Sequence, residues 1–448
     1  MINPLLSFTE NKRIGFFGIG KSNLAIIEKI AKQNSEITIR SDGKIDKSSL
    51  PHYLSSARFF EGDHSCDNID EDIIFFSPSV RRDRRELLCA LGRGVHFTSD
   101  IEFFIAHNEN PLFTVTGSDG KTTTATLAAR ILSCDECPAL PIGNIGDPAC
   151  NHLLSKNTKF VLEASSFMLE YAAPTAKRAV ITSLTPEHLS WHYGYDGYKN
   201  AKARAFQNAE EAVISADSPD LLDMFSGKDF FAVTGANYNF QKIRCLAKAQ
   251  LYYCVENDCI TENGRAIINI NELKRNEIFN IKCYLSALAL TREYASEERA
   301  IEVIREFSGI EHRGEIFFEK NGIRFINSSI DTSPQRTAET LFGVSGNIIL
   351  LLGGRSKGLD YAPLQRAVNA RSIKAIILFG ESRDEIYANV RSKERILSES
   401  LNDAIKTAIN IAIAGDTILL SPSATSYDEF SNFEERGTFF KNRVLSSF

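Results

Sequence analysis

The chain has 448 residues, of which 43% are hydrophobic and 24% are charged, and its formal net charge is −6. This composition indicates a soluble globular protein with room for about two to four domains, and the acidic balance argues against a nucleic-acid-binding surface. No segment approaches the roughly 20 apolar residues of a membrane span, and the first ten residues lack the apolar stretch of a secretion signal.

Short apolar, β-branched runs alternate with helix-length amphipathic stretches along most of the chain. The candidate strands, in chain order, are Arg13–Phe17, Ile37–Arg40, Ile73–Phe76, Leu112–Val115, Phe160–Glu163, Ala179–Ser183, Ala212–Ser215, Phe230–Val233, Arg324–Asn327, Ile348–Leu352, Ala375–Phe379 and Thr417–Leu420. Candidate helices between them include Lys121–Leu132, Pro334–Phe342 and Leu401–Ala414. The alternation predicts an α/β fold of parallel sheets with helices on both faces, which binds ligands at the carboxyl ends of its strands.

Strand-to-glycine transitions open three α/β blocks, at Gly18, Gly117 and Gly353. Polar or glycine-bearing breaks near His107 and Gly309 separate these blocks. The predicted domains are 1–107, 108–308 and 309–448. The segment Ala249–Ile270 is rich in short β runs with turn residues between them, so we expect a small β insertion in the middle block.

Nine cysteines, an odd number, are scattered along the chain. In a protein of this size they predict reduced thiols and a cytoplasmic location. Cys134 and Cys137 have the C-x-x-C spacing, but no second pair follows at zinc-ribbon spacing. We therefore interpret them as two ordinary thiols.

The strongest local signal is the segment Thr114–Thr124, which lies between an apolar strand and an amphipathic helix. Its glycines allow a tight loop whose backbone amides, together with the helix N-terminus, bind phosphate. Lys121 is placed to reach the β- and γ-phosphates of a nucleotide and Thr122 to bind Mg²⁺. The predicted phosphate-binding residues are Gly117, Ser118, Asp119, Gly120, Lys121, Thr122 and Thr123. A glycine-rich turn that binds nothing is the competing interpretation, and the Gly-Lys-Thr at a strand-to-helix junction disfavours it.

The loop is shorter than the Walker form, because Val115 stands where that motif has glycine. This T-G-x-x-G-K-T spacing resembles the Mur ligase family. Family-like motifs follow in the same order: GNIG at 143–146, EASSF at 163–167, TPEH at 185–188, YKNAK at 198–202, HR at 312–313, NSSIDT at 327–332, GGRSKG at 353–358 and SPSATSYDEFSNFEERG at 421–437. Together they cover all three blocks, and the last stretch is most similar to the family member that adds D-glutamate.

The resemblance implies a Rossmann-like N-terminal domain, a central P-loop ATPase-like domain and a Rossmann-like C-terminal domain. It also implies an ATP- and Mg²⁺-dependent ligase that joins D-glutamate to UDP-N-acetylmuramoyl-L-alanine through an acyl phosphate, a cytoplasmic step of peptidoglycan precursor synthesis. In the same way we expect a monomer with no nucleic-acid or membrane partner.

The resemblance also assigns site residues. The implied catalytic residues are Lys121, Asn144, Glu163, His188 and Lys202. The implied metal ligands are Thr122, Glu163, His188 and Lys202, the last as a carbamate. Asn280 is expected to contact adenine, and Arg313 is expected to reach the phosphates when the C-terminal domain closes. On local sequence alone, His188 also fits a hydrogen-bonded surface or core residue and Arg313 an ordinary surface arginine.

Two further sites follow from the resemblance. The segment Gly18–Asn23 is a partial G-x-G-x-x-G motif that alone would weakly suggest NAD, but in context it resembles a uridine-nucleotide site. The implied residues there are Gly18, Gly20, Lys21, Ser22, Ser41, Asp42, Ser77 and Asn144. For D-glutamate, Thr332 and Lys357 are expected to hold one carboxylate, and Ser426 and the Phe433 backbone amide the other. Lys357 also fits a solvated surface lysine.

Some positions depart from the family pattern. They are Ser183, Cys283, Ser328 and Ile330, and they put the contacts to adenine and ribose in question. Two other functions stay open: a related ligase that adds a different amino acid or uses a folate, and a nucleotide-binding regulator without ligase activity. The N-terminal block argues against the folate enzymes. The presence of Lys121, Glu163, His188 and Lys202 together argues against a regulator.

Overall fold

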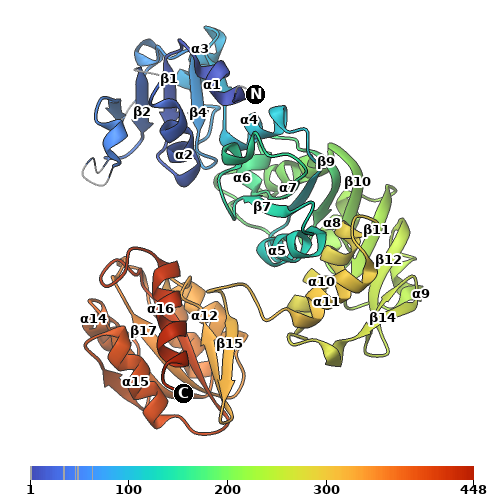
Figure 1. The fold of residues 1–448 in the computed structure, drawn as a ribbon, viewed down its shortest axis with the longest axis vertical. Coiled ribbons are helices and arrows are strands. Elements are labelled where there is room, and N and C mark those ends of the chain that lie inside the picture. The colour runs from blue at the N-terminus through green and yellow to red at the C-terminus, as the bar shows by residue number, and fades with distance from the viewer. Residues whose placement is uncertain (1–2, 34–35, 46, 48–49, 63) are drawn as a thin grey trace. The chain divides into compact units, whose positions relative to one another are not determined.

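The computed structural model describes residues 3–33, 36–45, 47, 50–62 and 64–448. It confirms the α/β prediction: three sheets, each mainly or wholly parallel, are covered by helices (Figure 1). The chain forms two compact units, Met1–Glu306 and Phe307–Phe448. The first unit holds the N-terminal and middle sheets and the second holds the C-terminal sheet. The predicted limits of the three domains remain predictions.

The N-terminal sheet has the strand order β3-β2-β1-β4-β5, and all its pairings are parallel. Its strands are β1 (Ile14–Phe17), β2 (Ile37–Ser41), β3 (Arg58–Glu61), β4 (Ile73–Phe76) and β5 (His96–Thr98). Its helices are α1 (Pro4–Thr9), α2 (Lys21–Ile30), α3 (Arg85–Gly92) and α4 (Asp100–His107). The order reverses at β1, so the crevice between β1 and β4 is the topological switch point at which such sheets bind nucleotides.

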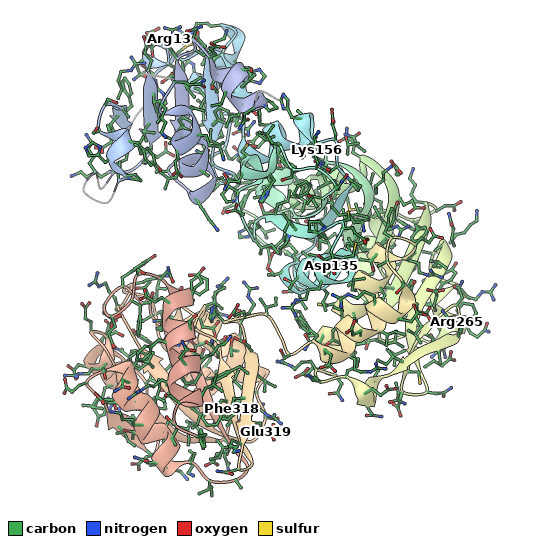
Figure 2. The ribbon with its side chains drawn as sticks, viewed as in Figure 1. Arg13, Asp135, Lys156, Arg265, Phe318 and Glu319 are labelled. Atoms are coloured by element: carbon green, nitrogen blue, oxygen red, sulfur yellow. A yellow bond between two sulfur atoms is a disulfide. The ribbon has the colours of Figure 1, made fainter. Side chains whose placement is uncertain are left out.

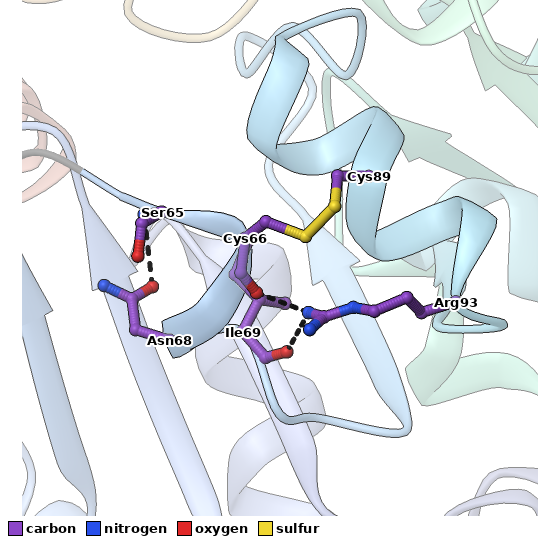
Figure 3. Close-up of a disulfide and its surroundings, with 6 residues drawn as sticks. All are labelled: Ser65, Cys66, Asn68, Ile69, Cys89 and Arg93. Atoms are coloured by element: carbon purple, nitrogen blue, oxygen red, sulfur yellow. Dashed lines mark hydrogen bonds between the residues drawn. A yellow bond between two sulfur atoms is a disulfide. The ribbon is translucent and has the colours of Figure 1, made fainter.

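One pair of cysteines corrects the prediction of reduced thiols. Cys66, in the short helix η3 (Cys66–Asn68), forms a disulfide with Cys89 of α3, and their Cα atoms are 5.9 Å apart (Figure 3). Arg93 adds a second link, because its guanidinium donates to the carbonyl oxygens of Cys66 and Ile69. The prediction was wrong for this pair because the fold, and not the sequence spacing, brings η3 and α3 together. The other cysteines are free.

The middle sheet has the order β14-β13-β12-β11-β10-β9-β6-β8-β7. Its strands are β6 (Leu112–Thr116), β7 (Ala139–Gly143), β8 (Lys159–Glu163), β9 (Thr175–Ile181), β10 (Asn208–Ser215), β11 (Asp229–Gly235), β12 (Lys248–Glu256), β13 (Cys259–Glu262) and β14 (Arg265–Asn269). Its helices are α5 (Lys121–Leu132), α6 (Ser166–Leu169), α7 (Tyr195–Ala203), α8 (Pro219–Met224), α9 (Phe240–Ile243), α10 (Ile278–Thr291) and α11 (Glu297–Glu306).

The β-rich segment predicted in the middle block extends this sheet at its edge. β12 pairs in parallel with β11, whereas β13 and β14 continue as an antiparallel meander. Arg265 lies on β14, at the edge of the middle sheet (Figure 2). Its guanidinium donates to the Glu297 carboxylate. A charged residue on an edge strand discourages pairing with other chains.

The C-terminal sheet has the order β15-β16-β20-β17-β18-β19, and only the β15–β16 pair is antiparallel. Its strands are β15 (Glu315–Lys320), β16 (Ile323–Asn327), β17 (Asn347–Gly353), β18 (Ile373–Phe379), β19 (Arg395–Leu397) and β20 (Asp416–Ser423). Its helices are α12 (Pro334–Phe342), α13 (Ala362–Ala370), α14 (Arg383–Asn389), α15 (Leu401–Ile411) and α16 (Phe433–Leu445).

Alternation along β17 explains why this sheet is covered on both faces. Ile348 and Leu350 pack into a core with α12, α13 and α14, whereas Ile349 and Leu351 pack into a second core with α15 and α16. All four side chains are fully buried. A strand with two buried faces reads as a continuous apolar run, which is why the sequence pattern predicted it.

The sequence patterns missed five of the described strands. They are β3, β5, β7, β15 and β19. β3 alternates between exposed and half-buried residues, and β5 and β19 have three residues each. No helix within the described residues is long and apolar enough to cross a membrane.

Candidate functional site

Four adjacent parallel strands of the middle sheet, in the order β9-β6-β8-β7, end at the same edge. The phosphate loop follows β6, Glu163 ends β8, and Asn144 follows β7. The loop that contains His188 follows β9. The topology therefore gathers at one edge most of the predicted catalytic residues, which are spread along the sequence from 121 to 188.

The phosphate loop needs glycine at two positions. Gly117 has a φ of 146°, and a Cβ there would lie 2.1 Å from the Thr182 hydroxyl oxygen. Gly120 has a φ of 81° and caps α5 in the left-handed conformation. Only glycine adopts these conformations without strain. They turn the chain so that α5 begins at Lys121 and directs its free N–H groups and its positive dipole end toward the loop.

Lys121 closes over this loop. Its Nζ donates to the carbonyl oxygens of Gly117 at 2.9 Å and Ser118 at 2.6 Å. The Ser118 hydroxyl is itself tied to the backbone of Thr185 and to the Tyr198 hydroxyl. The cation is thus held beside the amides that the sequence predicts to bind phosphate.

Glu163 is a buried carboxylate with one oxygen unused. Asn144 Nδ2 donates to Glu163 Oε1 at 2.7 Å, and the Asn144 backbone amide donates to the Glu163 carbonyl oxygen. Glu163 Oε2 is buried and has no hydrogen-bond partner in the described structure. A buried carboxylate oxygen without a partner is costly. A hard divalent cation such as Mg²⁺ would satisfy it, so the donor set fits the predicted metal.

Lys202, on α7, is 2% exposed. Its Nζ donates to the Gly117 carbonyl oxygen at 2.7 Å and to Thr116 Oγ1 at 3.3 Å, and no carboxylate of the described residues pairs with it. Burial, together with the charge of Lys121, lowers the pKa of Lys202 to about 7. Lys121 and Lys202 share one acceptor, so two ammonium groups there repel each other.

His188 is less well defined by its contacts. It is an exposed residue with a φ of 51°, and its ring lies 4.7 Å from that of Phe167. A positive φ at a non-glycine residue is uncommon and occurs both in turns and at functional sites. His188 thus lies on the loop after β9, but no contact joins it to Lys202 or Glu163 in the described structure.

Sequence reasoning gave no role to two residues that support this site. Tyr198 on α7 bonds to Ser118 and donates to Glu187 Oε2 at 3.1 Å. Trp191 donates from Nε1 to the carbonyl oxygen of Ser79, which lies on the loop after β4. The first joins α7 to the phosphate loop, and the second joins the N-terminal sheet to the His188 loop. The motif that contains Tyr198 was the only sequence signal for either.

Helix α10 carries the residues expected near adenine. It packs against α5, and Cys283 on it lies against the phosphate loop, where its Sγ is 3.8 Å from the Gly120 carbonyl oxygen. Asn280 is nearly buried and donates to Glu277 Oε2 at 2.9 Å. Cys283, a departure from the family pattern, thus fills the space beside Gly120 with an apolar thiol.

Two of the predicted uridine-nucleotide residues, Gly18 and Ser77, meet at the β1–β4 crevice. Gly18 has a φ of 85°, and a Cβ there would lie 2.7 Å from the Ser77 hydroxyl oxygen. Asn23 takes the place of a third glycine, and its amide donates to the Gly18 carbonyl at 2.8 Å and to Ser77 Oγ at 3.3 Å. The two strand ends therefore lie in direct contact, and Asn23 joins them.

The other residues expected there are occupied by protein partners. Asp42 forms an ion pair with Arg84 at 2.6 Å, which lowers the pKa of that carboxyl. Lys21 donates from Nζ to the Gly146 carbonyl oxygen at 2.9 Å, so it joins the N-terminal sheet to the loop after β7. Ser22 bonds to the buried Asp100. Gly20 is the N-cap of α2, and Ser41 Oγ accepts from the Gly43 amide.

The predicted amino-acid residues follow three neighbouring strands of the C-terminal sheet. Thr332 follows β16, Lys357 follows β17 and Ser426 follows β20. Lys357 Nζ donates to Thr332 Oγ1 at 3.0 Å, so the pair expected to hold one carboxylate is already in contact. Phe433 is the first residue of α16, where a backbone amide has no helical acceptor.

The remaining residues that depart from the family pattern are engaged within the protein. Ser328 accepts from the Gly314 amide at 3.1 Å, and the Ile330 amide donates to the His312 carbonyl. Ser183 Oγ accepts from the Asp119 amide at 2.8 Å, within the phosphate loop. Arg313 belongs to the second compact unit and the phosphate loop to the first, so the expected contact of Arg313 with phosphates stays a prediction.

Two family models match the chain. One, described as the Mur ligase middle domain, matches residues 115–290, and the other, described as the Mur ligase glutamate ligase domain, matches residues 312–424. A UDP-N-acetylmuramoylalanine–D-glutamate ligase from Clostridium botulinum (strain Kyoto / Type A2) is 31% identical over 453 residues, which is 98% of this chain and 97% of that protein. The chain belongs to the Mur ligase family. The N-terminal sheet lies outside both models but inside the full-length alignment.

Other Mur ligases extend the comparison. A protein of the same name from Ruminiclostridium cellulolyticum is 31% identical over 486 residues, covering 99% of both chains. Among solved structures, UDP-N-acetylmuramate–alanine ligase MurC from Thermotoga maritima has a TM-score of 0.55 at 18% identity, covering 98% of this chain and all of that one. MurF from the same organism, solved with ADP, has a TM-score of 0.51 at 15% identity and covers both chains fully. At these identities the structures support the shared three-domain fold.

Proposed function

We propose that this Mur ligase joins D-glutamate to UDP-N-acetylmuramoyl-L-alanine at the expense of ATP, in the cytoplasm. The observation that carries the proposal is one sheet edge that joins a phosphate loop, a buried carboxylate with an unused oxygen and a buried lysine without a carboxylate partner. The full-length similarity to ligases of that name supports the choice of substrates.

The proposed reaction has two steps. The alanyl carboxylate attacks the γ-phosphorus of ATP, the bond to the β-phosphate oxygen breaks, and ADP leaves. The amine of D-glutamate then attacks the acyl phosphate, the carbon–oxygen bond to phosphate breaks, and inorganic phosphate and a proton leave as the amide forms. Lys121 and the α5 N-terminus stabilise the negative charge that moves between the phosphates.

Mg²⁺ would be held by Glu163 Oε2 and Thr122, with His188 and a carbamate on Lys202 as ligands nearer the acyl phosphate. When bound, it supplies positive charge that offsets the repulsion between a carboxylate and the triphosphate. Asn144 keeps Glu163 oriented for this task, since it occupies Oε1 and leaves Oε2 available.

Phosphate release tests the proposal. With ATP, Mg²⁺ and UDP-N-acetylmuramoyl-L-alanine, the protein is expected to release phosphate only when D-glutamate is added. Release with another amino acid, and not with D-glutamate, would identify a related ligase. No release with any amino acid, combined with measurable ATP binding, would favour a nucleotide-binding regulator.

The amino-acid site gives a prediction that separates it from the nucleotide site. Lys357→Ala and Ser426→Ala are each expected to raise the KM for D-glutamate by about tenfold, the effect of losing ~1.4 kcal/mol of binding, and to leave the KM for ATP within about twofold. The reason is that both residues follow strands of the C-terminal sheet, in the other compact unit from the phosphate loop. Initial rates at varied D-glutamate and varied ATP provide both constants.

Lys374→Ala is the matched control, because this C-terminal lysine pairs with Asp416 at the amino end of β20. Its effect on the KM for D-glutamate is expected to be small. If Lys357→Ala raises the KM for ATP and leaves the KM for D-glutamate unchanged, Lys357 belongs to the nucleotide site.

A further inference from the structure

Arg436, on the first turn of α16, is a fully buried cation without a carboxylate in contact. Its Nε donates to Ser329 Oγ at 3.0 Å, its Nη2 to the Ser329 carbonyl at 2.9 Å and its Nη1 to the Ala424 carbonyl at 3.1 Å. Within the described C-terminal unit, no carboxylate oxygen lies within 4.0 Å of it. All its acceptors are neutral, so its charge is under-compensated.

The other buried arginines of the chain differ in this respect. Arg40 forms an ion pair with the buried carboxylate of Glu71 at 2.8 Å, and Arg178 forms one with Glu211. A buried charge is normally paired in this way, because removing an unpaired ion from water carries a large free-energy penalty. Arg436 departs from a pattern that the same chain otherwise follows.

The nearest carboxylates to Arg436 act at longer range and are engaged elsewhere. Asp331 accepts from the hydroxyls of Ser421 and Thr340, both at 2.7 Å. Asp428 accepts from the Glu381 amide, and Glu429 accepts from the Leu401 amide. Burial raises the pKa of both Asp331 and Glu429. Burial lowers the pKa of Arg436 to about 10, so the guanidinium stays charged at neutral pH.

The guanidinium lies beneath the loops that carry the proposed amino-acid site. Its partner Ser329 precedes Thr332 on the loop after β16, and its partner Ala424 precedes Ser426 on the loop after β20. A third loop lies close as well, because a Cβ on Gly354 would lie 2.9 Å from Arg436 Nη1. Gly354 precedes Lys357 on the loop after β17.

A second observation points to a ligand at the same place. Ser423, at the end of β20 and directly before Ala424, has a φ of 60° and is 3% exposed. Its hydroxyl has no hydrogen-bond partner among the described residues. Strained backbone conformations cluster at functional sites, and a buried hydroxyl without a protein partner is satisfied by a ligand or an ordered water.

We infer that Arg436 is a positioning and specificity-determining residue for the acidic amino acid. It holds the three loops in register, and the carboxylates of the substrate complete the charge balance that the protein leaves open. This inference rests on the proposed function. It also explains selectivity, because a neutral side chain in the place of the distal carboxylate would leave the guanidinium uncompensated.

The test compares Arg436→Lys, which keeps the charge, with Arg436→Gln, which removes it. Arg436→Gln is expected to raise the KM for D-glutamate by about tenfold or more, with the KM for ATP within about twofold, and to narrow the preference for D-glutamate over D-glutamine. Arg436→Lys is expected to keep the KM for D-glutamate close to the wild-type value. A merely structural role would lower the melting temperature in both variants without this difference.

Arg178→Gln is the matched control for removing a buried arginine. It is expected to lower the melting temperature and to leave the KM for D-glutamate unchanged, because Arg178 lies on β9 and contacts Glu211 and the end of α10. Wild-type-like KM values in Arg436→Gln, or equal KM values in the Lys and Gln variants, would overturn the inference alone. A wild-type protein that prefers a neutral amino acid would overturn both the inference and the proposed function. Phosphate release by the wild-type protein with different amino acids measures this preference without any variant.

Discussion

Replacement of Lys121 by alanine is expected to reduce phosphate release more than about tenfold, equivalent to a barrier increase above ~1.4 kcal/mol, while the protein stays folded. Among the described residues, the Lys121 ammonium donates to the loop carbonyls of Gly117 and Ser118. It lies at the start of α5, outside the apolar cores, so its removal has little effect on packing. Its removal takes away a cation that offsets charge on the transferred phosphoryl group.

A stability measurement and a control variant show whether this effect is specific to the loss of the Lys121 ammonium. The melting temperature of Lys121→Ala should match that of the wild type within a few degrees, as surface substitutions usually do. Lys248→Ala is the control, because this lysine of the same sheet is exposed and pairs with the exposed Asp229. A Lys121→Ala protein that keeps more than about a tenth of the wild-type rate would show that another group supplies the phosphate cation.

The parts of the fold that sequence predicted are those in which a strand is buried on both faces. β17 was found within one residue of its observed limits, whereas β20 was found from its apolar part and extends to Ser423, beyond the predicted end at Leu420. α5 and α12 were also found at their observed limits, because a glycine or serine cap precedes a clear helical period. Short edge strands such as β19 have no such pattern, since their residues are half-buried or exposed.

The candidate site divides in the same way. Residues in the phosphate loop were predicted from local chemistry, because a glycine-rich turn before a helix has few other uses. The burial of Lys202 and Arg436 could not be predicted, since each depends on a helix packing against loops more than 80 residues away in the chain. The Cys66–Cys89 disulfide was missed for a similar reason, because the fold and not the sequence spacing brings η3 and α3 together.

Replacement of Lys202 by alanine is expected to give a nearly inactive protein that small carboxylates such as formate or acetate partly rescue. An ammonium at this position would repel metal ions held by Glu163 and His188, so we propose that the amine reacts with CO₂ and loses a proton to give a carbamate. The structure supplies two conditions for that reaction. Lys202 is buried without a carboxylate partner, and its lowered pKa, about 7, leaves much of the amine neutral and nucleophilic at physiological pH.

Lys199→Ala is the matched control, because Lys199 lies on the same helix but forms an ion pair with the exposed Asp196 at 2.7 Å. It is expected to stay active and to show no response to formate. In Lys202→Ala, the removed side chain leaves a buried space next to Thr116 and the Gly117 carbonyl, in which a small anion can take the place of the carbamate as a metal ligand. Rescue should therefore saturate with formate concentration and fall with the size of the carboxylate. Full activity of Lys202→Ala without any added carboxylate would rule out the carbamate. An inactive Lys202→Ala protein that no carboxylate rescues, combined with an unmodified Lys202 amine in the active wild-type protein, would also rule it out.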